Sequence, residues 1–315
     1  MSYLAIDFPF MKIKQGKEGR VMGQKDLVEK RLEDYEDVFS DIFNGLVFGE
    51  DIIKQQYLRA SSTESIYKTE NGIYRNQFRD VLKEYTDNCL LEIGSLGIEN
   101  QSTIDKYIPV RIMGYDYVNY RSQIDRKKYP LLPVITIVLN FSDKPWNKTK
   151  SLQSIMKISN KFKPYVQDYK IMVFDIAFLE DEVIERFTSD FKLIAKFFKN
   201  KRLGNPDMFE DDEIDHVAAF MDFLAVFTGD DRYRKIKKDL MKKGGRITMC
   251  SVAQALEEKG IKKGIDQGRA IGIIETCFDN GMTEKDILCW LQKKLEITLK
   301  MAEDYMKLYE NRLIN

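Results

Sequence analysis

Apolar residues recur at two different spacings along the chain, which predicts helices towards its two ends and strands in the middle. From Asp26 to Gly49 they recur every three or four residues, as in a long amphipathic helix. The opposite face of this predicted helix is acidic, and we interpret it as exposed to solvent; it carries Glu33, Asp34, Asp37 and Asp41.

Alternating or continuous apolar runs predict a sheet between about residues 80 and 180. Residues 81–85 fit a strand or a helix, whereas Leu90–Glu99 alternates like a strand, and a turn signal separates the two. We therefore expect a hairpin. Pro133–Phe141 is almost wholly aliphatic, which is typical of a central strand covered on both faces, and Lys170–Leu179 alternates. The expected fold is α/β, with a mixed sheet flanked by helices.

Helical spacing also predicts helices between and after these strands, at Tyr115–Ile124, Asp181–Phe187, Asp190–Arg202 and Asp211–Thr228. The C-terminal region is expected to be all helical, with Thr283 and Thr298 as N-caps. Within it glycine recurs every fourth residue from Gly260 to Gly272. Each glycine costs a helix about 1 kcal/mol relative to alanine. This stretch therefore suggests either a homo-oligomer packed through the C-terminal helices or a weak linker.

The composition excludes several classes of enzyme. The single histidine, His216, argues against catalytic triads and two-histidine metal sites, and the four cysteines lack a metal-binding spacing. Any hydrolytic site must therefore use carboxylates. Basic and acidic residues number 50 each, so a polyanion would contact local basic segments such as Arg232–Arg246 or Lys144–Lys150, unless these are only solvated. No secretory signal or bilayer-spanning run is visible, so we expect a cytoplasmic protein without a membrane partner.

Two acids and an amide are the candidate chemical groups. Asp80 begins the first segment of the predicted hairpin, Glu99 ends the second, and Gln101 follows two residues later. In a strand, Glu99 and Gln101 project from the same face, with Asp80 across the hairpin. Two hard oxygen ligands at strand ends are what a Mg²⁺-dependent phosphodiesterase requires.

Several sequence blocks resemble, in order, the Rpn-type putative transposases, which are also described as PD-(D/E)XK nuclease family transposases or as carrying a YhgA-like putative transposase domain. The blocks include GQKDLVEKRLEDYEDVFSDIFNGLVF, RDVLKEY, LGIENQSTID, YRSQI and YPLLPVITIVLNFSDKPWN. The similarity covers roughly residues 23–235. It implies a restriction-endonuclease-like core that hydrolyses DNA with Mg²⁺ or Mn²⁺.

Residue by residue, the resemblance implies that Asp80 and Glu99 are the metal-binding acids of the nuclease motif. Gln101 stands where many nucleases outside this family have lysine. Glutamine can only hydrogen-bond, so stabilisation of the charge on the phosphate is left to the metal ion and to Arg121. The supporting residues implied by the matching blocks are Asp41, Tyr120, Arg121 and Gln123.

The chain is predicted to have four segments: an N-terminal extension (1–22), a nuclease-like domain (23–205), a helix with a basic linker (206–246) and a helical C-terminal region (247–315). Two functions fit these observations. One is a metal-dependent DNA endonuclease associated with recombination or mobile DNA. The other is a catalytically silent module that binds DNA or protein on a nuclease-derived fold, which the zero net charge and the missing lysine favour slightly.

Overall fold

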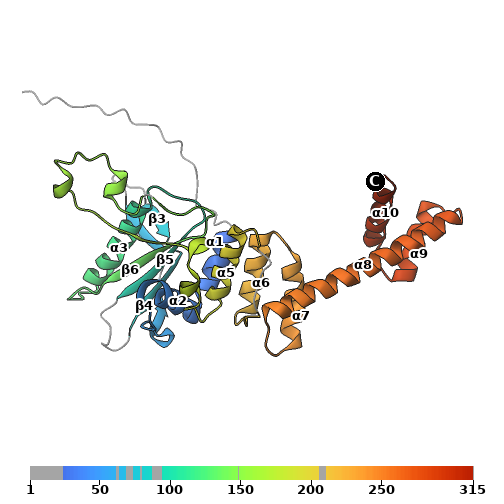
Figure 1. The fold of residues 1–315 in the computed structure, drawn as a ribbon, viewed down its shortest axis with the longest axis horizontal. Coiled ribbons are helices and arrows are strands. Elements are labelled where there is room, and N and C mark those ends of the chain that lie inside the picture. Colours follow the sequence, from blue (N-terminus) through green and yellow to red (C-terminus); the bar gives the residue numbers. More distant parts are fainter. Residues whose placement is uncertain are drawn as a thin grey trace, which may run out of the picture.

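A computed structural model describes residues 24–61, 64–68, 74–78, 80–86, 94–147, 149–205 and 211–314. Its centre is a five-stranded sheet, beside which two further strands form a separate hairpin (Figure 1). The strands of the sheet are β1 (Leu58–Ala60), β4 (Val81–Tyr85), β5 (Ser95–Gln101), β6 (Val134–Asn140) and β7 (Met172–Asp175). The separate hairpin consists of β2 (Glu64–Lys68) and β3 (Tyr74–Phe78).

The sheet is mixed, with the strand order β1-β4-β5-β6-β7. β1, β4 and β5 are antiparallel neighbours, whereas β5, β6 and β7 run parallel. The predicted hairpin is confirmed over its described residues, with Val81 opposite Ile98. All of β5 is buried, and so is β6 from Thr136 onward, as expected for strands covered on both faces. β7 is shorter than predicted because residues 176–178 form a 3₁₀ helix.

The predicted helix from Asp26 to Gly49 is wrong as a single element. The chain forms α1 (Gln24–Glu33), α2 (Glu36–Phe43) and a π-helical turn (Asn44–Phe48), which ends at Gly49 as expected. A buried cation explains the break between α1 and α2. Lys83 of β4 is 1% exposed, and its ammonium donates a 2.7 Å hydrogen bond to the carbonyl of Asp34. A buried charge needs such acceptors, and the end of a helix supplies one.

Helices cover both faces of the sheet (Figure 1). α3 (Ile108–Asp125) lies on one face, where Ile112 and Tyr115 pack against Val138 of β6. The helix starts earlier than predicted, and Pro109 in its first turn suits that position. The main core lies on the other face, and it includes residues of α1, α2, α5 (Phe191–Arg202) and α6 (Val217–Thr228). The short α4 (Asp181–Ile184) precedes α5.

The start of α6 differs from the prediction, because residues 211–216 are not helical. Glu213 instead forms an isolated bridge with Thr248, and the backbone of His216 leaves the helical region with ψ of 57°. α7 (Arg232–Lys243) and the beginning of α8 (Met249–Asp279) join the same core as the sheet through residues such as Ile236 and Val252.

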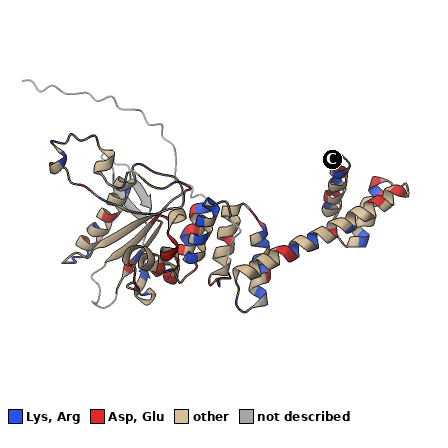
Figure 2. Cartoon of the chain, in the orientation of Figure 1, with Lys and Arg blue, Asp and Glu red and all other residues tan. Residues whose placement is uncertain are grey.

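The far end of α8 belongs to a separate small core (Figure 1). There it packs with α9 (Glu284–Leu295) and α10 (Leu299–Ile314) around Ile274, Leu291 and Met306. Both predicted N-caps are confirmed, because the hydroxyls of Thr283 and Thr298 accept backbone hydrogen bonds from residues three positions on. Both basic and acidic residues occur along α8 (Figure 2). None of the helices in the described ranges has the length and apolar character needed to cross a membrane.

Candidate functional site

The structure brings Asp80, Glu99 and Gln101 to one end of the β4–β5 hairpin. Because Val81 pairs with Ile98, Asp80 and Glu99 are the next residues on the two strands. The Asp80 carboxylate accepts a 2.8 Å hydrogen bond from the backbone N–H of Asn100, between Glu99 and Gln101. The Gln101 amide donates to Glu99 Oε1 over 3.2 Å. These three residues, which are separated in the sequence, therefore lie close together in the structure.

Arg111, which the sequence did not single out, is the cation of this cluster. Its guanidinium donates a 2.7 Å hydrogen bond to Oε1 of Glu99, a side chain that is 0% exposed, and it also pairs with Asp105. Burial, the largest single effect, would lower the pKa of Arg111. The charge of Glu99, the hydrogen bond to Glu99 and the charges of Tyr115 and Asp105 together outweigh burial and raise that pKa. The predicted helix began at Tyr115, so the sequence did not place Arg111 in a first turn. In the structure the helix begins at Ile108, and Arg111 therefore lies near the end of β5.

On the other face of β5, helix α1 contributes two buried glutamates. Glu33 is 1% exposed and accepts a 2.6 Å hydrogen bond from the Asn100 side chain, while Glu29 is 2% exposed. Neither carboxylate oxygen of Glu29 has a hydrogen-bond partner among the described residues. The two lie one turn apart on the same side of the helix. The predicted solvent-exposed acidic face is therefore wrong for Glu33, and also for Asp41, which is 8% exposed.

The ionisation of both glutamates is disfavoured. Burial raises the pKa of Glu33 to about 8, helped by the charge of Asp80 and opposed by the hydrogen bond from Asn100. Burial likewise raises the pKa of Glu29 well above its usual value, and the charges of Glu33 and Asp80 add to this effect. The α1 side of the cluster is thus a region of concentrated negative charge, in which a carboxyl group retains its proton at neutral pH.

The carboxyl ends of the three parallel strands extend this polar edge. Gln101 lies beside Asn140, and Asn140 lies beside Asp175. The fully buried Asn140 donates to Asp175 over 2.7 Å, and the backbone N–H of Trp146 donates to the same carboxylate oxygen. Ligands of sheets with parallel strands bind at this end of the strands, so the edge is the candidate functional site.

Comparison with protein families supports part of the resemblance seen in the sequence. Residues 95–221 match the family model described as "Putative transposase, YhgA-like". This segment is therefore similar to that family. It contains Glu99, Gln101 and Arg111, whereas Asp80 and α1 precede it. No curated protein and no solved structure matches the chain.

Two of the supporting residues in the YhgA-like segment lie at the wrong end of the sheet for a role beside Glu99. The Gln123 side chain donates to the carbonyl of Leu132 and accepts from its N–H, at 3.0 and 2.8 Å. The Tyr120 hydroxyl accepts from the N–H of Val134, at the amino end of β6. Both residues therefore fix the entry into β6.

The direction of α3 explains this correction. Between two parallel strands the connecting helix runs back along the sheet, so its first turn lies near the carboxyl end of β5 and its last turn near the amino end. β5 is seven residues long, so its two ends are about 20 Å apart. Arg121 is likewise exposed in the second half of α3 and pairs with Asp125 over 3.2 Å. Arg111 takes the place near Glu99 that was predicted for Arg121.

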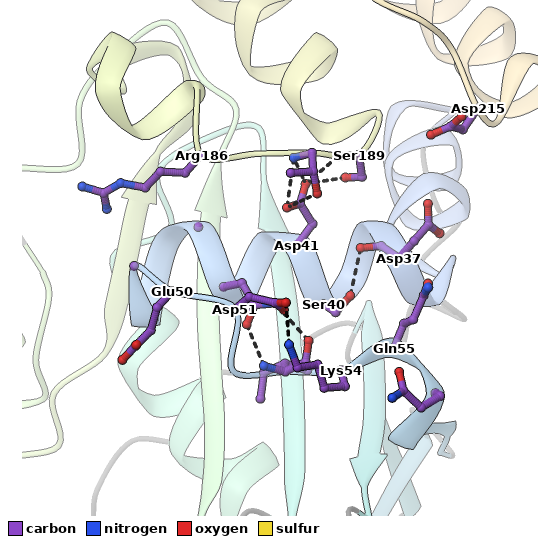
Figure 3. Close-up of a pocket in the computed structure, with 16 residues that line it drawn as sticks. Asp37, Ser40, Asp41, Glu50, Asp51, Lys54, Gln55, Arg186, Ser189 and Asp215 are labelled. Carbon is purple, nitrogen blue, oxygen red and sulfur yellow. Dashed lines mark hydrogen bonds and ion pairs between the residues drawn. The ribbon is translucent and has the colours of Figure 1, made fainter. Parts of the chain in front are cut away.

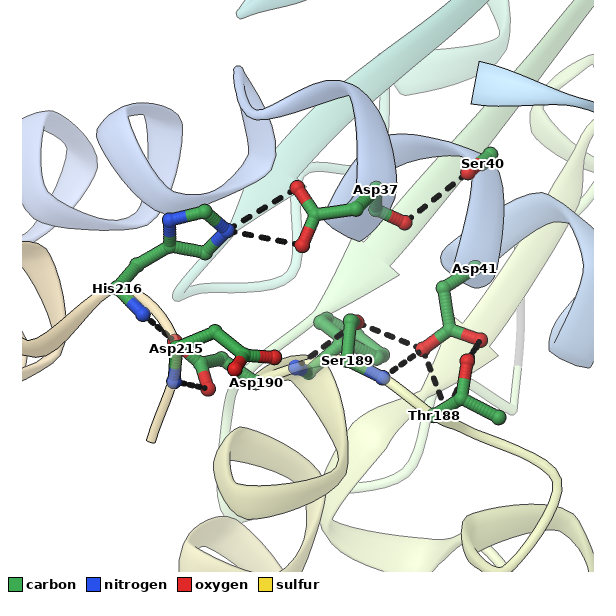
Figure 4. Close-up of polar contacts among 9 residues, drawn as sticks. Asp37, Ser40, Asp41, Thr188, Ser189, Asp190, Asp215 and His216 are labelled. Atoms are coloured by element: carbon green, nitrogen blue, oxygen red, sulfur yellow. Dashed lines mark hydrogen bonds and ion pairs between the residues drawn. The ribbon is translucent and has the colours of Figure 1, made fainter. Parts of the chain in front are cut away.

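Asp41 has a different environment from that of Asp80. Figure 4 shows its carboxylate directed at the turn before α5, where it accepts hydrogen bonds from the backbone and hydroxyl groups of Thr188 and Ser189 at 2.6–3.2 Å. The same figure shows His216 hydrogen-bonded to Asp37. These contacts tie α2 to segments that come much later in the chain, so we assign Asp41 and His216 a structural role.

A cavity of about 560 Å³ lies beside α2 (Figure 3). Its lining includes Asp37, Asp41, Asp51 and Arg186, and none of Asp80, Glu99 or Gln101. The cavity is therefore separate from the cluster at the sheet edge. Among the described residues, no group of three or more histidine, cysteine, aspartate or glutamate side chains is arranged to hold a metal ion. A metal ion at the sheet edge would therefore have fewer than three ligands of these residue types.

Proposed function

We propose that the protein is a metal-dependent DNA endonuclease of the PD-(D/E)XK type, acting in recombination or on mobile DNA. The YhgA-like match supports a role connected with mobile DNA. The observation that carries the proposal is the meeting of Asp80, Glu99 and Gln101 at one end of the β4–β5 hairpin. A phosphodiesterase needs carboxylates and a water-positioning group within reach of one phosphate, and this cluster supplies both.

The donor set fits Mg²⁺. This ion is commonly held by one or two carboxylates and completes its coordination with water and substrate phosphate, so Asp80 and Glu99 suffice; Mn²⁺ accepts the same oxygen ligands. The buried carboxyl oxygens of Glu29 have no hydrogen-bond partner among the described residues, and a divalent cation nearby would offset the cost of ionising this group. Once bound, such an ion would lower the pKa of a coordinated water and neutralise phosphate charge.

The protein groups around Glu99 would orient the reaction. Arg111 and Gln101 both donate to Glu99 Oε1, which holds this carboxylate in one orientation. In the proposed mechanism the Gln101 amide also hydrogen-bonds the attacking water beside Glu99. Arg111 supplies a positive charge near the position that lysine occupies in other nucleases, and it would stabilise the charge developing on the phosphate.

The test is nicking of supercoiled plasmid by the full chain in Mg²⁺ and in EDTA. We expect nicking that requires the metal and that disappears in Asp80→Ala and in Glu99→Gln. Asp125→Asn, an exposed acid at the other end of α3, is the matched control and should cut at the wild-type rate. Circular dichroism of each variant reports whether it folds. Nicking by a folded Asp80→Ala protein at the wild-type rate would show that the site is assigned wrongly.

One observation favours the second candidate, a binding module that does not cleave. The Glu99 carboxylate, fully buried, already has a counter-ion in Arg111 at 2.7 Å, so its charge is compensated without a metal. The plasmid assay separates the two candidates, because a binding module retards the plasmid in a gel without nicking it, in Mg²⁺ and in EDTA alike.

A further inference from the structure

A long excursion between β6 and β7 projects from the sheet, and its base is firmly held (Figure 1). Trp146 is fully buried at its start and donates through its indole N–H to Thr149. At its end the Tyr169 hydroxyl donates to Asp116 of α3. A bridge between residues 151 and 170 closes the base. The excursion is therefore anchored on the α3 face, with its tip held away from the core.

The tip exposes two aromatic rings around a single 3₁₀ turn, Lys163–Tyr165. Phe162 is 60% exposed and Tyr165 is 82% exposed. Large apolar rings are usually buried, and they gain most free energy when they are. Two such rings three residues apart on an anchored turn therefore indicate a surface that contacts a partner.

The charge around these rings is strongly positive, although the chain as a whole is neutral. Between residues 144 and 170 the sequence has seven lysines and one acid, Asp168. Lys157, Lys161 and Lys163 are exposed around the tip, and within the described residues none of the three forms an ion pair. Asp168 instead accepts a 2.9 Å hydrogen bond from the backbone N–H of Gln153. The partner of the tip is therefore expected to be anionic.

We infer that this tip binds single-stranded DNA, with Phe162 and Tyr165 stacking on unpaired bases and the lysines contacting phosphates. Every base has a face on which an aromatic ring stacks, so this contact tolerates any sequence. In an intact duplex the bases are stacked on each other, and the rings find no exposed base face. The inference deepens the proposed function and rests on it. The excursion leaves the sheet directly after Asn140, which lies beside Gln101, so its base adjoins the candidate site.

The test measures binding of a fluorescent 20-nucleotide oligo(dT) and of a duplex of equal length by fluorescence anisotropy. EDTA is present so that no DNA is cleaved. We expect the full chain to prefer the single strand. Phe162→Ala with Tyr165→Ala should weaken that binding about tenfold or more, whereas Phe162→Tyr with Tyr165→Phe should keep it. Tyr129→Ala is the matched control, because Tyr129 is 94% exposed but lies outside the excursion, and it should leave binding unchanged.

Salt dependence tests the lysines separately. Replacing Lys157, Lys161 and Lys163 with alanine should reduce the slope of log binding constant against log salt by about 2, because each phosphate contact on a single strand contributes about 0.7. Replacing Lys293, Lys300 and Lys307 with alanine, three exposed lysines of α9 and α10 outside the excursion, is the control for loss of charge alone.

Two results would overturn the inference: unchanged oligo(dT) binding in the double aromatic variant, or equal affinity of the wild type for duplex and single strand. Neither result depends on cleavage. Asp80→Ala should still bind oligo(dT) as wild type does, so loss of nicking with retained binding would refute the nuclease and leave the role of the tip standing.

Discussion

Replacing Glu33 with glutamine should make the protein more stable at alkaline pH. Glu33 is buried on α1, and its pKa is raised from 4.5 to about 8, first by burial and then by the charge of Asp80. In the unfolded chain the same group loses its proton near pH 4.5. Between these two values the folded protein binds more protons than the unfolded chain, so the free energy of unfolding falls as pH rises.

The size of the effect follows from the two pKa values. One pKa unit corresponds to about 1.4 kcal/mol. The 3.5 units between 4.5 and 8 therefore correspond to a loss of up to about 5 kcal/mol across this window. Such a loss is a large part of the stability of an ordinary domain. In Glu33→Gln the loss is absent, and the glutamine oxygen can still accept the hydrogen bond from Asn100.

Urea unfolding of both proteins at pH 5, 6, 7 and 8 measures this directly. We expect the wild-type free energy of unfolding to fall more steeply than that of Glu33→Gln, by about 1.4 kcal/mol per pH unit. Glu29 also has a raised pKa, so some dependence on pH should remain in the variant. Glu303→Gln, an exposed acid on α10, is the control and should reproduce the wild-type profile. Parallel profiles for wild type and Glu33→Gln would refute the burial of an uncharged carboxyl group.

Three further substitutions test other parts of the structure. Arg111→Ala leaves the charge of Glu99 buried without its counter-ion, so urea unfolding at pH 7 should show a loss of about 3–5 kcal/mol that shrinks in acid; a loss below 1 kcal/mol would contradict the pairing. Asp41→Ala removes the acceptor for two backbone N–H groups and should cost about 2–4 kcal/mol by the same measurement, whereas a neutral result would contradict its structural role. Gly264→Ala with Gly268→Ala should raise the melting temperature. An added Cβ meets nothing within 4 Å in this chain, and each change favours the helix by about 1 kcal/mol. A lower melting temperature together with loss of a dimer in light scattering would instead support a homo-oligomer packed through α8.

The local pattern was sufficient to predict the hairpin that carries the candidate site. Alternation and a turn signal predicted the pairing of the segments around Asp80 and Glu99, because strand periodicity is a property of adjacent residues. The aliphatic run of β6 likewise predicted a central strand. Helix ends were less predictable: the break at Asp34 depends on Lys83, which comes from a strand far along the chain.

The errors among the site residues have one physical origin. Tyr120, Gln123 and Arg111 all lie on α3, and only the direction of that helix against the sheet decides which of them reaches Glu99. Helical spacing predicts the face of the helix on which a residue lies. It does not predict which end of the sheet that residue lies near. Arg111 was therefore missed, and the three residues of the YRSQI block, Tyr120, Arg121 and Gln123, were placed wrongly.

The sequence by itself determined the α/β class, the hairpin and the resemblance that the YhgA-like match supports over residues 95–221. These follow from short-range periodicity and from blocks of neighbouring residues. The tertiary structure alone decided that Glu33 is buried with a raised pKa, that Arg111 pairs with Glu99 and that Asp41 is structural. The reason is that burial and charge pairing depend on which elements pack together, and those elements are far apart in the chain.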